Sequence, residues 1–98
     1  MLVVVTYDEF GGIWDHVAPP KGDRWGPGPR IPAMIVSPFA KRGYVDHTQY
    51  DTTSILAFIT RRFGLPELPG LTARTAAFKA HGAKANGDLT AALTMMPH

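Results

Sequence analysis

The chain has 98 residues, 45% of them hydrophobic, and a formal net charge of +2. This length allows one small domain at most, and the composition is that of a globular protein rather than a disordered one. The ten basic residues form no block of five or more, which gives no support to nucleic-acid binding or to membrane-surface binding. The sequence has no cysteine, which excludes a disulfide framework and a thiolate metal site.

The first predicted element is a strand at the amino terminus. An unbroken run of apolar and β-branched residues covers 2–6 and leads into Tyr7, which is typical of a strand buried on both faces in a parallel sheet. Such a strand needs neighbours on each side, and a chain of this length supplies few. We therefore expect the chain to be the C-terminal piece of a larger domain. The run is too short for a transmembrane segment and lacks the basic start of a signal peptide.

Two adjacent carboxylates, Asp8 and Glu9, follow the predicted strand directly. Open α/β sheets bind ligands beside the carboxyl ends of their strands, and carboxylates suit a divalent metal ion or acid–base chemistry. The glycines at positions 11 and 12 permit a tight turn that exposes both side chains. The pattern favours a metal site. The alternative is that the pair caps a helix or faces water.

Residues 10–31 form a connection that contains five glycines and four prolines. A structureless connection of about twenty residues is rare in a compact domain unless it is functional. A histidine beside an acid, as in Asp15-His16, can bind a metal, protonate a leaving group or donate to a phosphoryl oxygen. The alternative is a surface pair without a role. No P-loop pattern surrounds Arg24 and Arg30, which favours a structural role for both.

A second short strand and a helix are expected next. Residues 33–37 form an apolar run that Pro38 stops, and Asp51 is a good N-cap for a helix. Gly64 suits the position after the helix, and Pro66 prevents its continuation. The expected helix carries an apolar stripe at helical spacing, formed by Ile55, Leu56, Phe58, Ile59 and Phe63.

The chain changes character beyond Leu65. Prolines and a glycine interrupt residues 66–70, and residues 72–85 are rich in Ala, Thr and Lys with little periodicity. We therefore expect residues 75–87 to be loosely held. Residues 88–93 are able to form one or two helical turns.

Several motifs follow one another along the chain: TYDEFGGIWDHVAPP at 6–20, GPGPRIP at 26–32, VSPFA at 36–40, GYVDH at 43–47, YDTTSIL at 50–56 and RFGL at 62–65. In this order they resemble the C-terminal signature of the bacterial phosphoesterase family. That family holds phosphatidylcholine-type phospholipases C and a branch of acid phosphatases, within the alkaline phosphatase superfamily.

The resemblance implies an α/β fold, of which this chain is the C-terminal portion of a three-layer α/β/α alkaline phosphatase-like sandwich. Residues 1–70 would form the C-terminal part of the catalytic domain, and residues 71–98 a weakly ordered extension. The missing N-terminal part of the domain would be the main partner of this piece. The family also implies a secreted or periplasmic location.

The resemblance further implies metal-dependent hydrolysis of a phosphoester substrate. Asp8 and Glu9 take the place of metal ligands for a divalent ion, and Asp15 and His16 that of active-site residues. The remaining ligands and the nucleophile belong to the absent part, so we expect this piece alone to be inactive. The motif KGDRWGPG at 21–28 favours the acid phosphatase branch, with a phospholipase C-type phosphodiesterase as the alternative.

The sequence departs from the family pattern at two positions, and it also allows one other class of function. Phe10 stands where many members have Asn, and Thr52 where some have His. The other class is a non-catalytic interaction module whose short sheet and Gly/Pro-rich loop contact a partner chain.

Overall fold

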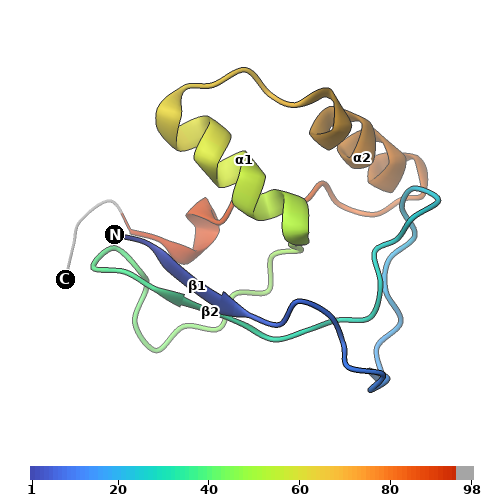
Figure 1. The fold of residues 1–98 in the computed structure, drawn as a ribbon, viewed down its shortest axis with the longest axis horizontal. Helices are drawn as coiled ribbons and strands as arrows, with labels where there is room; N and C mark the ends of the chain where they lie inside the picture. Colours follow the sequence, from blue (N-terminus) through green and yellow to red (C-terminus); the bar gives the residue numbers. More distant parts are fainter. Residues whose placement is uncertain (95–98) are drawn as a thin grey trace.

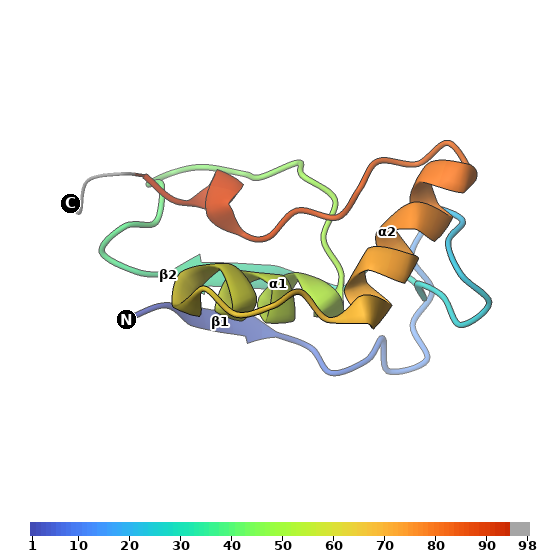
Figure 2. The same cartoon turned by 90° about the horizontal axis from the view of Figure 1, so that it is seen from above.

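The computed structural model describes residues 1–94 as a small mixed α/β structure (Figure 1). Its two strands form one antiparallel sheet, and helix α1 lies over one face of that sheet (Figures 1 and 2). No helix within residues 1–94 is long and apolar enough to cross a membrane. The elements in chain order are β1 (Val3–Thr6), β2 (Ala33–Val36), α1 (Thr52–Phe63), α2 (Pro69–Ala80) and the 3₁₀ helix η1 (Thr90–Ala92).

Strand β1 is present as predicted, but its surroundings differ from the prediction. It pairs antiparallel with β2, with Val4 opposite Ile35 and Val5 opposite Met34. Val4 and Ile35 are half-buried, whereas Val5 and Met34 on the opposite face are exposed. The prediction of a strand buried on both faces in a parallel sheet is therefore wrong for this chain. The physical reason is that residues 1–94 supply one neighbouring strand and cover one face.

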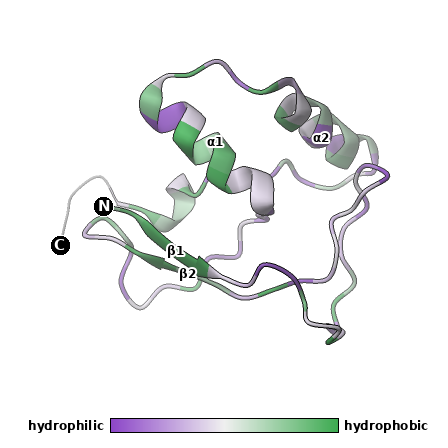
Figure 3. Ribbon diagram, viewed as in Figure 1, coloured by the Kyte–Doolittle hydropathy of each residue, from purple (hydrophilic) through white to green (hydrophobic). Residues whose placement is uncertain are grey.

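Helix α1 begins and ends where the sequence predicts. The side chain of Asp51 accepts a hydrogen bond from the Thr53 amide, and the Asp51 amide donates one to Ser54 Oγ, which completes a capping box. Gly64 takes the left-handed conformation with φ of 63°, the usual way to end a helix. In Figure 3 both strands have the hydrophobic colour, whereas α1 has hydrophobic and hydrophilic segments.

Helix α2 lies where we expect loosely held chain. Its first residue is Pro69, whose missing N–H costs nothing at a helix start, and it runs into the alanine-rich segment. Phe78 from this helix is 1% exposed, and Leu71 is also buried. The expectation that residues 75–87 are loosely held is wrong for residues 75–80, which belong to α2, because the buried Leu71 and Phe78 side chains hold this helix against the rest of the chain.

The end of the described chain folds back on the residues that follow β2. The amide of Lys41 donates to the carbonyl of Ala92, with an N···O distance of 2.9 Å, and an isolated β-bridge joins Ala40 to Leu93. Leu89 and Ala92 are buried there. The expected short helical segment is therefore present as η1, while residues 95–98 of the predicted extension lie outside the described residues.

Candidate functional site

Asp8 and Glu9 lie in an exposed turn immediately after β1. Gly11 and Gly12 have φ values of 65° and 77°, which L side chains rarely adopt, so the turn depends on glycine. The amide of Gly11 donates to a carboxylate oxygen of Glu9 at 2.9 Å. Both carboxyl groups thus stay at the surface, as the sequence predicts, and one Glu9 oxygen is oriented by the backbone.

The carboxylate oxygens of this pair are suitable ligands for a divalent cation, but they are too few to complete its coordination shell. Such an ion usually takes six or more oxygen ligands, and two carboxylates supply only part of that shell. Within residues 1–94 no group of three or more His, Cys, Asp or Glu side chains could hold a metal ion. A complete site needs ligands from other chain segments, and the metal role of Asp8 and Glu9 stays a prediction.

The second predicted pair, Asp15 and His16, lies farther along the same loop. The His16 ring nitrogen Nδ1 is 3.2 Å from Asp15 Oδ1, and the His16 side chain is 87% exposed while that of Asp15 is only 13% exposed. Arg30 Nε donates to Asp15 Oδ2 at 2.6 Å, and Arg30 Nη2 donates to Oδ1 at 3.2 Å. Asp15 therefore links His16 to the far end of the loop, and Arg30 has the structural role that the sequence favours.

The ion pair keeps Asp15 in its charged form. The hydrogen bond from Arg30, followed by that from the Val17 amide, holds the pKa of the Asp15 carboxyl below its usual value. The same hydrogen bond raises the pKa of Arg30. The ionised Asp15 carboxylate therefore lies beside Nδ1 of an exposed imidazole ring. This arrangement suits proton transfer or phosphoryl binding, but the catalytic role stays a prediction.

A third group of charges was not predicted from the sequence. Arg74 on α2 donates from Nε to Asp23 Oδ2 and from Nη1 to Asp51 Oδ2, both at 3.1 Å. All three side chains are at most 22% exposed. Asp23 lies in the long loop and Asp51 caps α1, so one guanidinium joins three segments. Since 51 residues separate Asp23 from Arg74, no local pattern could have revealed this pair.

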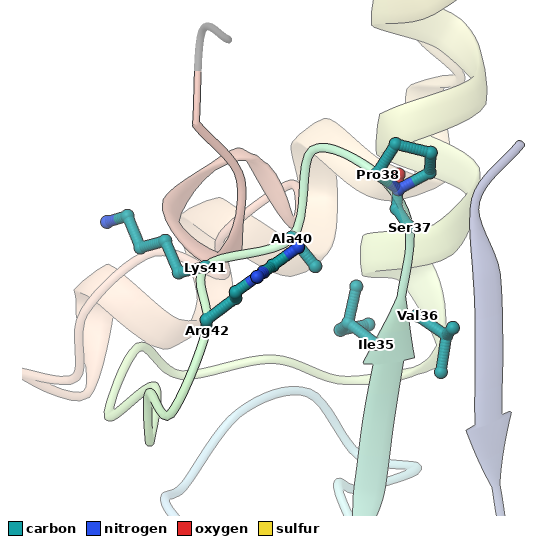
Figure 4. A pocket seen from close by; sticks show the side chains of 7 residues that line it. All are labelled: Ile35, Val36, Ser37, Pro38, Ala40, Lys41 and Arg42. Atoms are coloured by element: carbon teal, nitrogen blue, oxygen red, sulfur yellow. The ribbon is translucent and has the colours of Figure 1, made fainter. Parts of the chain in front are cut away.

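One surface pocket, of about 430 Å³, lies beyond the carboxyl end of β2 (Figure 4). Because the strands are antiparallel and Val3 lies opposite Val36, this end of β2 adjoins the start of β1. The predicted acidic pair follows the other end of β1. The pocket therefore lies away from the predicted chemistry. Its lining residues are Ile35, Val36, Ser37, Pro38, Ala40, Lys41 and Arg42.

Another open pocket, of about 470 Å³, lies between the long loop and the end of α2. Lys21, Arg24 and His81 contribute to its lining, and the guanidinium of Arg24 lies 4.3 Å from the ring centre of Trp25. The acid in this lining, Asp23, is already paired with Arg74. The pocket thus has a basic rim. The sequence favoured only a structural role for the loop that forms it.

Known proteins resemble this chain over part of their length. A non-hemolytic phospholipase C of Pseudomonas aeruginosa is 32% identical over 96 residues, which cover 66% of this chain and 14% of that protein. A non-hemolytic phospholipase C of Burkholderia pseudomallei is 38% identical over 85 residues, covering 60% and 12% respectively. Phospholipase C B of Mycobacterium tuberculosis is 35% identical over 95 residues, covering 72% and 18%.

The chain therefore spans less than a fifth of the length of these relatives. No solved structure matches it. The model of the Phosphoesterase family matches residues 1–66, a segment that includes both strands, the whole long loop and α1. On this match, which covers more than half of its residues, the chain belongs to the Phosphoesterase family.

Proposed function

We propose that this chain is the C-terminal part of the catalytic domain of a metal-dependent phosphoester hydrolase with a three-layer α/β/α fold. The family match over residues 1–66 carries the proposal. The one-sided sheet supports it as well, because the apolar face that carries Val5 and Met34 is what a second helical layer would cover. The full enzyme would act in a secreted or periplasmic location.

In this proposal, the loop after β1 supplies two sets of residues. Asp8 and Glu9 would supply part of the coordination shell of a divalent ion. The bound ion would stabilise negative charge on the phosphoryl oxygens. Asp15, fixed by Arg30, lies beside His16 Nδ1, and the exposed imidazole would take part in proton transfer at a phosphoryl or leaving-group oxygen. The nucleophile and the other ligands come from the N-terminal part of the domain.

The relatives are named phospholipases C, and this favours a phospholipid substrate over a simple phosphomonoester. The acid phosphatase reading is the second candidate, and the motif at residues 21–28 carries it. That motif forms most of the basic-rimmed pocket beside α2. Both candidates share the chemistry of phosphoester hydrolysis and differ in what the substrate carries beyond the phosphate.

The test uses the complete protein that contains this chain, assayed with p-nitrophenyl phosphorylcholine and with p-nitrophenyl phosphate. We expect chelation to abolish hydrolysis and a divalent ion to restore it. Asp8→Asn and Glu9→Gln should each lower kcat/KM by at least about a hundredfold, since each removes a charged metal ligand. Glu67→Gln, at an exposed acid that accepts from Thr72, is the matched control and should keep full activity.

A complete protein that ignores chelation, or that keeps its activity in both variants, would contradict the proposal. The 98-residue chain assayed alone should hydrolyse p-nitrophenyl phosphate no faster than a blank. Turnover by that chain which Asp8→Ala abolishes would show instead that the site is complete within these residues. A complete protein that binds no divalent ion would favour the non-catalytic module.

A further inference from the structure

The loop at residues 10–31 is fixed at two separate points. Near its base, Arg30 pairs with Asp15 through two hydrogen bonds. At its tip, Asp23 accepts from Arg74, which belongs to α2. The tip is also organised internally, because the Trp25 amide donates to Asp23 Oδ1 at 3.0 Å. The first contact closes the loop on itself, and only the second ties it to another element.

Close packing accompanies the ion pair at the tip. A Cβ placed on Gly22 would lie 2.9 Å from a ring carbon of Phe78, so the loop backbone lies directly on that side chain. Phe78 is 1% exposed and, like Arg74, belongs to α2. Helix α2 thus offers the loop an apolar contact and a charged contact, one turn apart on the same helix.

The charged contact is strong enough to outweigh the cost of partial burial. Burial by itself would lower the pKa of Arg74, but the hydrogen bonds and charges of Asp23 and Asp51 raise it. For Asp23, burial would raise the pKa, while the Trp25 amide and Arg74 lower it. Both groups stay charged, and their pairing does not depend on a change of protonation near neutral pH.

We propose that Arg74 is a positioning residue for the loop that carries Asp15 and His16. Helix α2 then contributes to catalysis by holding this loop in place. This helix lies beyond residues 1–66, the segment that matches the family. Arg74 acts at the loop tip and, through Asp51, on the start of α1, so the loop is held at a fixed place relative to α1. The proposal rests on the proposed function only for its effect on activity.

The first arm of the test measures hydrogen exchange in the complete protein and needs no activity. Arg74→Ala should raise amide exchange at residues 21–26 by about tenfold, the effect of losing one charged hydrogen bond. Asp23→Asn removes the same contact while it keeps an acceptor for the Trp25 amide and leaves the Arg74–Asp51 pair intact. It should produce the same rise, and the double variant should exceed neither single variant.

The matched control is Arg61→Ala, because Arg61 pairs with Asp88 at 2.8 Å rather than with an acid of the loop. Exchange at residues 21–26 should stay unchanged in this variant. Unchanged exchange in Arg74→Ala, or an equal rise in Arg61→Ala, would overturn the proposal. If Arg74→Ala fails to fold, Asp23→Asn alone decides, since it leaves both helices with their own contacts.

The second arm measures hydrolysis by the same proteins. Asp23→Asn and Arg74→Ala should lower kcat about tenfold or more with a smaller change in KM, because a misplaced His16 affects the reaction more than binding. Arg74→Lys, which reaches one carboxylate at a time, should restore part of kcat. An inactive wild-type protein would refute the proposed function, and the exchange arm would still decide whether Arg74 positions the loop.

Discussion

At the scale of single residues, Asp15 shows how one carboxylate can serve several neighbours. It accepts from the Arg30 guanidinium and from the Val17 amide, and His16 Nδ1 lies beside it. Its own side chain is largely covered, while the histidine ring that it contacts faces outward. Under the proposed function, Asp15 would therefore act on the substrate through His16 rather than by direct contact.

The charge pairing makes a prediction for acid pH. Arg30 lowers the pKa of Asp15 below the ordinary value of 3.8, so the pair is fully present above that pH. As the pH falls through the lowered pKa, Asp15 takes up a proton and its contribution to stability is lost. Carbon-detected NMR titration of the Asp15 carboxyl group should give a midpoint below 3.8.

The variant Arg30→Ala should move that midpoint up toward the ordinary value. Arg24→Ala is the matched control, because Arg24 lies in the same loop but stacks on Trp25 instead. A midpoint that does not move in Arg30→Ala would show that the pair in the structure does not form in solution.

At the scale of elements, the two helices show different sequence signals. Helix α1 has a capping acid, an apolar stripe and a glycine end, and all three are local features that a sequence shows directly. Helix α2 has no side-chain cap and few large apolar residues. Pro69 suggested a break there, yet a proline in the first turn of a helix is compatible with it. What holds α2 is long-range contact by Phe78 and Arg74.

The end of α1 offers a test with a matched pair of variants. Gly64→Ala should lower the free energy of unfolding by about 1 kcal/mol, because φ of 63° is costly for any residue with a Cβ. No neighbour lies within 4 Å of that Cβ, so the effect is conformational. Gly70→Ala, in the first turn of α2 and equally unobstructed, should instead leave stability unchanged or raise it by up to about 1 kcal/mol.

Urea unfolding of the complete protein measures both changes. Equal effects of the two variants would contradict the left-handed end of α1, since that conformation is the difference between the two sites.

At the scale of the whole molecule, the described chain has a small core and a large apolar surface. The buried apolar residues come from α2 and the segment after it, whereas β1 and β2 keep one face exposed. A monomeric protein rarely exposes so many neighbouring apolar side chains without a partner for them. In the proposed sandwich, the rest of the domain covers this face. The exposed side chains of the sheet are Val3, Val5, Met34 and Val36.

Neighbouring valines on opposite faces of β1 test that arrangement in the complete protein. Val4→Thr should lower the free energy of unfolding by about 1 kcal/mol, because Val4 faces the covered side. If the rest of the domain covers the other face, Val5→Thr should cost about as much. Ile13→Thr, in the exposed loop, is the control and should change stability by less than about 0.5 kcal/mol.

Urea unfolding again provides the measurement. A Val5→Thr variant as stable as the control would mean that this face stays open to solvent in the complete protein, and the three-layer arrangement would be wrong.

The sequence by itself determined the features that depend on neighbours along the chain. The strand positions, the long loop, the caps of α1 and the family signature all follow from short-range patterns. Tertiary structure alone decided the antiparallel pairing of β1, the formation of α2, and the Arg74 contacts to Asp23 and Asp51. These depend on residues far apart in sequence, which burial and charge bring together only in the folded chain. The apolar pattern of a strand indicates which residues favour burial. The number of neighbouring elements decides whether those residues are buried.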